Sequence, residues 1–541
     1  MRRTMSRPPR SARGLPRWAG PALAALLLAL PPAAHAAKEH FVIAFQGDAA
    51  TLDAQGRNET TTISIQMHMF EALIFRAIDG GLEPGLALSW KAASPTRWLI
   101  KLRKGVRFHD GAPFTAEVAK ESLLRAQGKG FAKSQMKHFT KGIKEVRVVD
   151  EATLEIDTGT PYPTLPEDLA NIAIVPVDYI KKVGDAVFAR KPVGTGPYRF
   201  VEWVKDDHID MAANPAYWKG APTIKKVRVR PVPVNAARTA GLLAGEIDVV
   251  WGVSPVDAPQ LEANPNLKVY RTVTQRTIYL TFDHWRKEGG PLQKEGPYSP
   301  GLPKGHPNPF LKLKVRQAVA HALDVQALLK AVMHGSGVPA TQLNPPQAFG
   351  YNHRLKRLPY DPARAKKLLA EAGFPNGFKT RLDCPNDRYI NDGPMCEAIA
   401  GMLTKAGIVA TPNPRPKAVF FPQMDAGDFS MFMAGWGTQY VTPTYNAVFH
   451  TRDLKRGFGR INRGHYRSEE ADAIAAKASV EMDDKKRQAL WERMWEITMG
   501  DLASLPLYQQ EAIIATQKSV NLKPRFNEWV LAQEITLADK N

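Results

Sequence analysis

The chain has 541 residues, with 73 Lys and Arg against 53 Asp and Glu, which gives a formal net charge of +20 at pH 7. A chain of this length is too long for one hydrophobic core, so two or three lobes are expected. The basic residues are scattered, and no motif combines basic clusters with interleaved aromatic residues, which argues against a nucleic-acid partner.

Residues 1–36 have the pattern of a signal peptide. Six arginines precede a short apolar run, Leu23–Leu30. An Ala34-His35-Ala36 cleavage site follows this run. The apolar run is too short to span a bilayer. The residue directly after the cleavage site is Ala37 and not a cysteine, which argues against a lipoprotein. We therefore expect a soluble periplasmic protein that begins near Ala37; Arg2-Arg3 leaves twin-arginine export open beside the general secretory route.

The first half of the mature chain is predicted to contain mostly strands. Apolar runs and turn signals indicate strands at residues 41–45, 86–90 and 97–102, a hairpin at 143–149 and 152–156, and helices at 62–72 and 115–127. A strand at 227–232, a helix at 235–244 and a strand at 246–251 then form a βαβ pattern. This pattern predicts a parallel strand pair in an α/β lobe.

The second half is predicted to be richer in helices. A buried strand is expected at 278–282 and an exposed loop at 287–309, followed by helices at 314–334, 362–372, 394–406, 468–479 and 483–500. Strand patterns return at 505–508 and 511–515. The fold class expected from this order is α/β.

The stretch from Asp428 to Tyr440 is the strongest candidate for a ligand site. Phe429, Met431 and Met433 alternate as in a buried strand, which ends at Gly435-Trp436-Gly437 and is followed by three uncharged polar side chains. An aromatic wall with a few polar groups at a strand end is typical of small-molecule sites. The alternative is a core tryptophan at a bend.

Catalytic and metal-binding motifs were not found. The sequence has no H-E-x-x-H, G-x-S-x-G, Walker A or C-x-x-C pattern, so no catalytic residue, metal or cofactor is expected. The only cysteines, Cys384 and Cys396, could form a disulfide in an exported chain or remain two separate thiols.

Motifs along the whole mature chain resemble those of the extracellular solute-binding proteins of family 5, the receptors of dipeptide, oligopeptide and nickel ABC importers. The matching stretches are Thr51–Asp53, Met69–Ile74, Pro84–Trp90, Trp98–Gly111, Pro113–Glu117, Pro192–Tyr198, Asn214–Trp218, Leu243–Asp248, Val315–Asp324, Tyr360–Leu369, Gly435-Trp436 and Pro506–Tyr508. They occur in the family's order, and the block 84–117 is highly specific.

The resemblance implies a two-lobe periplasmic-binding-protein fold of type II. Lobe I would comprise residues 37–276 and 509–541, with an inserted subdomain at about 82–195, and lobe II residues 277–508. The crossovers would lie near Gln275–Thr281 and Leu505–Gln509. A peptide or other small solute would be held between the lobes of a monomer, and lobe closure would present it to the ABC permease subunits in the inner membrane.

Two departures from the family pattern concern the ligand. Peptide-binding relatives carry an Asp for the peptide's amino group where this chain has Gln439, and the oligopeptide receptors carry an Arg at the position of Met433. A free-amine peptide is therefore a poor match, and Arg388 for an anion or Asp387 for a cation could replace these charges. The expected ligand is a peptide, opine, sugar or metal chelate.

The predicted ligand-binding residues are Trp436, Gly435, Gln439, Tyr440, Thr438, Arg388, Asp387, Tyr389, Thr51 and Asp53. Two other functions remain open on the sequence alone. The first is an exported hydrolase of small esters or peptides, which would need a nucleophile and a base in the crevice. The second is a binding chaperone or signalling receptor on the same fold without a dedicated permease.

Overall fold

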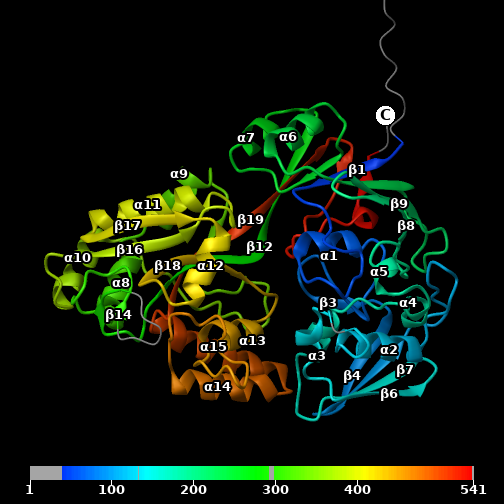
Figure 1. Ribbon diagram of the computed structural model, residues 1–541, viewed down its shortest axis with the longest axis horizontal. Helices are drawn as coiled ribbons and strands as arrows, with labels where there is room; N and C mark the ends of the chain where they lie inside the picture. Colours follow the sequence, from blue (N-terminus) through cyan, green and yellow to red (C-terminus); the bar gives the residue numbers. More distant parts are fainter. Residues whose placement is uncertain (1–38, 132, 292–297, 539–541) are drawn as a thin grey trace, which may run out of the picture. The chain divides into compact units, whose positions relative to one another are not determined.

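The computed structural model describes residues 39–131, 133–291 and 298–538 (Figure 1). The predicted signal peptide therefore lies outside the described residues. Within these ranges, no helix combines the length and the apolar character needed to cross a membrane. The description below concerns the unit that begins at His40.

Eleven strands form one mixed sheet. In spatial order they are β17 (Ile408–Arg415), β16 (Phe378–Pro385), β18 (Met431–Gly437), β12 (Leu267–Phe282), β19 (Ser504–Gln517), β11 (Val249–Trp251), β1 (Phe41–Phe45), β10 (Lys226–Pro231), β9 (His208–Ala213) and β8 (Tyr198–Val204), and β15 (Val338–Pro339) adds to β19. The two long strands β12 and β19 pair antiparallel along most of their length. They are therefore shared by both halves of the sheet (Figure 1).

The pairing of β12 with β19 is interrupted in the middle. The register shifts between Val273 and Thr277, and there Thr274 Oγ1 donates a hydrogen bond of 2.8 Å to the carbonyl of Gln510. Hydrophobic clusters on the two sides of this break are built from different residues: one side uses β1, β10 and β11, and the other uses β16, β18 and the helices that follow β12. The break thus separates two independently packed cores.

A second, four-stranded antiparallel sheet has a core of its own. It has the order β4 (Ala87–Ser94), β5 (Arg97–Leu102), β7 (Thr153–Asp157) and β6 (Glu145–Asp150). Helices α2 (Ala116–Ala126) and α3 (Leu165–Leu169) contribute to its cluster of buried residues. The Thr115 hydroxyl caps α2 by accepting from the Val118 amide. Two-residue to three-residue strands form the small pairs β2 (Ile74–Arg76) with β3 (Leu82–Pro84), β13 (Glu288–Gly289) with β14 (Tyr298–Ser299), and β20 (Val520–Asn521) with β21 (Thr536–Leu537).

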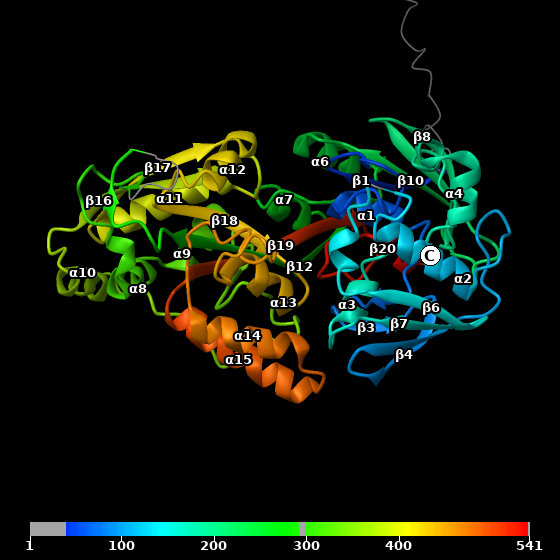
Figure 2. The same ribbon diagram turned by 60° about the horizontal axis from the view of Figure 1, so that its bottom comes forward.

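The remaining helices cover these sheets. They are α1 (Thr60–Gln66), α4 (Val177–Val183), α5 (Asp185–Phe188), α6 (Asn235–Leu243), α7 (Ala258–Glu262), α8 (Leu313–His321), α9 (Val325–Val332), α10 (Pro362–Glu371), α11 (Asp392–Lys405), α12 (Lys417–Asp425), α13 (Val441–Thr444), α14 (Glu469–Val480) and α15 (Asp484–Gly500), with short turns η1 (Lys137–Phe139), η2 (Pro309–Leu311), η3 (Tyr445–Phe449) and η4 (Ala532–Glu534). Helices α14 and α15 pack against each other (Figure 2).

Several predicted elements differ from the structure. The helix expected at 62–72 ends at Gln66, the strands expected at 505–508 and 511–515 are the single strand β19, and the loop expected at 287–309 contains β13 and β14. The single helix expected at 314–334 is two helices, because the Asp324 carboxylate accepts from the Ala327 amide and starts α9 anew. The βαβ strands β10 and β11 are not neighbours, because β1 lies between them and pairs parallel with both. Local sequence gives the direction of such strands but not which strand separates them.

Cys384 and Cys396 form a disulfide that joins the end of β16 to α11, with their Cα atoms 6.1 Å apart. Both side chains are fully buried. The disulfide thereby fixes the loop between this strand and this helix, which contains residues 386–391.

Candidate functional site

Three parallel strands end at one edge of the main sheet. β16 pairs with β17 up to Pro385 and Arg415, and it also pairs parallel with β18. The last residue of β18, Gly437, pairs with Arg276, next to the break in β12. The loops that follow β16 and β18 therefore lie close to the break in β12. Most of the predicted ligand residues are on these two loops.

Gly435 and Tyr389 are in direct contact. The Tyr389 hydroxyl donates a hydrogen bond of 3.2 Å to the Gly435 carbonyl. A Cβ atom at Gly435 would lie 2.7 Å from the Tyr389 ring and 2.9 Å from the side chain of Ile278. The glycine is thus required for the close approach of Tyr389, and two residues predicted from separate motifs form one surface.

Trp436 points away from that surface. Side chains alternate along a strand, so Trp436 faces the opposite side from Gly435 and Gly437. It is half-buried against the hydrophobic cluster that includes Phe432, and its indole N–H donates to Thr444 Oγ1 at 3.1 Å. The ring is therefore anchored on one side and partly exposed on the other. This is intermediate between a ligand-contacting aromatic residue and a core tryptophan, the two alternatives that the sequence left open.

Two unpaired hydrogen-bond acceptors lie at the segment after Trp436, one in the segment and one on Asn344, which contacts it. Asn344 Nδ2 donates to Thr438 Oγ1 at 3.1 Å and to the Tyr440 carbonyl at 3.2 Å, which fixes the orientation of the Asn344 amide. Its Oδ1 and the Oε1 of Gln439 are buried and have no hydrogen-bond partner among the described residues. Leaving such acceptors unpaired costs free energy, so this segment favours a ligand that donates hydrogen bonds.

Tyr440 connects this segment to the four-stranded-sheet part of the chain. Its hydroxyl donates to Asp168 on α3, and the Tyr162 hydroxyl donates to the other oxygen of the same carboxyl. Asp168 is only 2% exposed. Burial raises the pKa of the Asp168 carboxyl from 3.8 to about 7, and it outweighs the lowering by the two phenols. Glu167 raises this pKa further, and Arg76 lowers it.

The stability that Asp168 contributes should fall as pH rises, because ionising this buried carboxyl costs more than the two phenol hydrogen bonds return. A carboxyl with a raised pKa in the folded protein binds a proton that the unfolded chain releases, so its contribution is greatest below about pH 4 and is lost between about pH 4 and 7. We expect the difference in melting temperature between wild type and Asp168→Asn to decrease over this range. The exposed Asp178→Asn serves as control and should show no such trend; an equally flat Asp168→Asn difference would contradict the assignment.

The structure gives Asp53 a structural role in place of the predicted ligand contact. Its carboxylate is buried, and the guanidinium of Arg125 bonds both oxygens, at 2.6 and 3.2 Å. Thr51 Oγ1 accepts from the Asp53 amide at 3.1 Å and belongs to the same turn. Among the described residues, neither Asp53 nor Thr51 forms a hydrogen bond to any of the other predicted ligand residues.

The charged residues 387 and 388 lie on the loop before α11. Asp387 is exposed and accepts a 2.6 Å hydrogen bond from the Lys417 amide. Arg388 is exposed, stacks near the Tyr389 ring at 5.2 Å, and has no ion-pair partner in the described part of the chain. Asp387 thus holds the start of α12, and Arg388 retains an uncompensated charge.

Three residues near the candidate site, Arg276, Asn344 and Asp168, were not predicted from the sequence. Arg276 pairs with Gly437, so its side chain projects on the same face as Gly435; it is half-buried and has no acidic partner among the residues described. No local motif distinguishes these three residues, because each acquires its role from a segment distant in the chain.

One group of side chains has the composition of a metal site. Glu202, His208 and Asp210 place three possible ligand atoms within 4.8 Å of one another on β8 and β9. The Asp210 carboxylate is already bonded by both the Nε and a terminal nitrogen of Arg228, at 2.7 and 2.6 Å. Arg228 therefore already supplies the positive charge that a metal ion would bring to Asp210.

Comparison with known proteins assigns the chain to a family. The model of the bacterial extracellular solute-binding proteins, family 5 (middle), matches residues 81–453. The glutathione-binding protein GsiB of Salmonella typhimurium is 27% identical over 510 residues, which cover 92% of this chain and 94% of that protein.

Solved structures share the fold over nearly their whole length. HbpA2 from Haemophilus parasuis has a TM-score of 0.79 at 23% identity, and the match covers 92% of this chain and 99% of that one. DppA from Helicobacter pylori, solved in complex with the peptide STSA, has a TM-score of 0.73 at 24% identity, over 92% and 98%. The mixed α/β fold is thus that of periplasmic binding proteins, as predicted. The chain belongs to the bacterial extracellular solute-binding proteins of family 5, the substrate-binding receptors of ABC importers, which bind their solutes without transforming them.

Proposed function

We propose that this receptor works in the periplasm as a monomer and delivers its solute to ABC permease subunits in the inner membrane. The solute would bind between lobe I, residues 37–276 with 509–541, and lobe II, residues 277–508. The separate cores on either side of the break at Thr274–Arg276 support these lobes, with the core of the four-stranded sheet supporting the inserted subdomain at about 82–195. Strand breaks of this kind absorb hinge motion.

The proposed cargo is a carboxylate-bearing solute with neutral hydrogen-bond donors. The observation that carries this proposal is the contact of Gly435 with Tyr389 beside the charge of Arg276, which has no acidic partner among the described residues. The buried, unpaired oxygen of Gln439 follows two residues after Gly437. Arg276 and Arg388 suit a carboxylate, for which guanidinium groups provide paired donors. The unpaired oxygens of Gln439 and Asn344 suit amide N–H or hydroxyl groups. Glutathione and peptides, the ligands named for GsiB and for DppA, carry carboxylates and amide N–H groups of this kind, together with an ammonium group for which Gln439 offers no charge.

A thermal-shift panel tests this proposal. It would contain reduced glutathione, a dipeptide and its N-acetylated form, an opine, a sugar and a metal chelate. A solute present at 100 times its Kd should stabilise the native state by about 2.7 kcal/mol, because it binds the folded chain alone. Arg276→Gln should remove the shift, whereas Arg271→Gln, on the same strand but paired with Glu262, should keep it. A panel without any shift would count against the transport role.

Gln439→Asp should change the preference of the site. A carboxylate at this position would pair with an ammonium group, so affinity for the free-amine dipeptide should rise relative to its N-acetylated form, by about tenfold for a gain of about 1.4 kcal/mol. Titration calorimetry with the two forms measures the ratio. The matched variant Gln439→Asn keeps the side chain neutral and should leave the ratio unchanged. An unaltered ratio in Gln439→Asp would place this residue outside the cargo site.

A further inference from the structure

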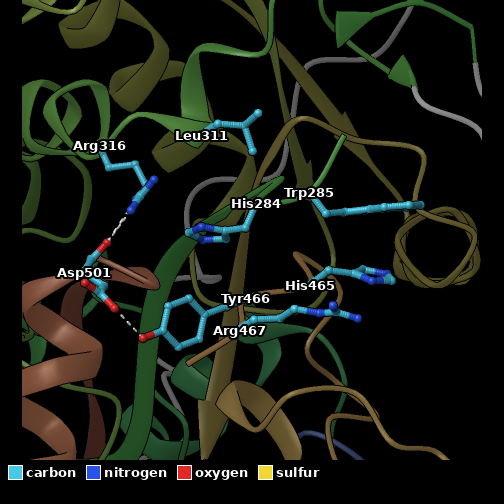
Figure 3. A pocket seen from close by; sticks show the side chains of 8 residues that line it. All are labelled: His284, Trp285, Leu311, Arg316, His465, Tyr466, Arg467 and Asp501. Atoms are coloured by element: carbon cyan, nitrogen blue, oxygen red, sulfur yellow. Dashed lines mark hydrogen bonds between the residues drawn. The ribbon is translucent and has the colours of Figure 1, made fainter. Parts of the chain in front are cut away.

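A pocket of about 530 Å³ lies at the opposite end of β12 from the candidate site. It opens after Phe282, which pairs with the first residue of β18, Met431, whereas the candidate site adjoins the last residue of that strand. The side chains that line the pocket are His284, Trp285, Leu311, Arg316, His465, Tyr466, Arg467 and Asp501 (Figure 3).

Cationic groups dominate the lining. The Arg316 guanidinium donates to the carbonyls of Asp501 and Phe310, and no carboxylate among the described residues lies within ion-pair distance of it. Arg467 is exposed and has neither a hydrogen bond nor an ion pair in the described part of the chain. The single acid, Asp501, accepts a 2.7 Å hydrogen bond from the Tyr466 hydroxyl.

The two histidines of the pocket are uncharged mainly because they are buried, and nearby arginines act in the same direction. Burial lowers the pKa of His465 to about 4, with further lowering by Arg452, Arg286 and Arg467. Burial lowers the pKa of His284 to about 3, and Arg316 contributes to this shift. Both rings are therefore neutral at physiological pH, and their charge does not change when the pH varies near 7.

The pocket also offers a flat surface and an unpaired donor. The Trp285 and His465 rings stack, with centroids 4.6 Å apart, and Figure 3 shows Arg467 beside them. The Trp285 indole N–H is buried and lacks an acceptor among the described residues. Because a buried donor without a partner is costly, an acceptor supplied by a ligand would stabilise this arrangement.

We propose that this pocket is a second binding site, remote from the cargo site, for a small planar organic anion such as an aromatic carboxylate. The ring of the anion contacts Trp285 and His465, and its carboxylate pairs with Arg467. Arg316, whose guanidinium is already bonded to backbone carbonyls, contributes only its positive charge. Bidentate guanidinium–carboxylate contacts and stacking on an indole provide the recognition. The site therefore distinguishes a charged ligand from its neutral isostere.

Titration of the mature protein with benzoate, benzamide and inorganic phosphate tests this inference. The indole ¹H–¹⁵N resonance that is absent from Trp285→Phe should shift with benzoate and remain unchanged with benzamide, while the Trp436 resonance stays fixed. Arg467→Gln should weaken benzoate binding at least about tenfold, as expected when one charge-assisted contact is lost. Arg456→Gln, the same charge change on an exposed loop of the same half, should have no effect.

Three results would overturn the inference: equal binding of benzoate and benzamide, a stationary Trp285 resonance, or equal weakening by both arginine variants. Phosphate adds a further discrimination. If phosphate shifts the Trp285 resonance with the same affinity as benzoate, the site recognises charge without the planar ring, and the proposed ligand class is wrong. Failure of the cargo panel would leave all of these results unaffected, because the pocket and the cargo site share no residue.

Discussion

Replacing Asp53 by alanine should lower the free energy of unfolding by about 3–5 kcal/mol, because it leaves a buried guanidinium without its main partner. The Arg125 side chain is 4% exposed and that of Asp53 is 2% exposed. Arg125 also donates to Gln55 Oε1 at 3.0 Å and lies 3.9 Å from the Phe131 ring. Urea denaturation of the two proteins measures the difference. Solute affinity of the folded variant should remain that of the wild type.

Asp185→Ala is the matched control. Asp185 bonds the same guanidinium at 2.8 Å, but its side chain is 47% exposed. Water can replace this carboxylate, so the expected loss is below about 1 kcal/mol. If Asp53→Ala instead kept normal stability and lost solute binding, Asp53 would be a ligand residue, as the sequence resemblance implied.

Much of the fold follows from local chemistry. Thr115 and Asp361, residue types that favour helix starts, are N-caps in the structure, and the hairpin predicted at 143–149 and 152–156 forms β6 and β7. These features depend on a few adjacent residues, so a single sequence contains the necessary information. The division of the helix at Asp324 shows the limit. Its apolar residues continue through the break, and only the side-chain hydrogen bond to Ala327 reveals the new start.

The candidate site is predictable in part for the same reason. Gly435 and Tyr389 each belong to a motif near a strand end, and parallel strands bring both ends to one edge. The partner of Tyr440 could not be found in this way. Asp168 lies 272 residues earlier in the chain, in a helix of five residues, and its role results from burial and from the two phenols. For Asp53 the sequence could not reveal the opposite feature, which is that this motif acid is paired with Arg125, 72 residues further along the chain.

Replacing Trp436 by alanine should weaken solute binding at least about 30-fold, as expected when an aromatic side chain worth about 2 kcal/mol is truncated. The ring is half-buried on the face opposite Gly435, and its N–H donates to Thr444, whose hydroxyl also bonds that of Thr438 in the polar segment. The loss of stability should be about 2 kcal/mol, which is less than the 3–5 kcal/mol of a fully buried tryptophan. Calorimetric titration and urea denaturation together separate the two effects.

Two tryptophan variants calibrate this result. Trp203 is also half-buried, and its N–H is held by Asp48 at 3.1 Å, but it packs on the other half of the sheet. Trp203→Ala should therefore cost similar stability and leave solute affinity unchanged. Trp495 is fully buried in the cluster on which Trp436 packs, so Trp495→Ala should cost the full 3–5 kcal/mol. If Trp436→Ala matched Trp495→Ala in stability and retained its solute, Trp436 would be a core residue, and the solute would depend on Tyr389 and Gln439 instead.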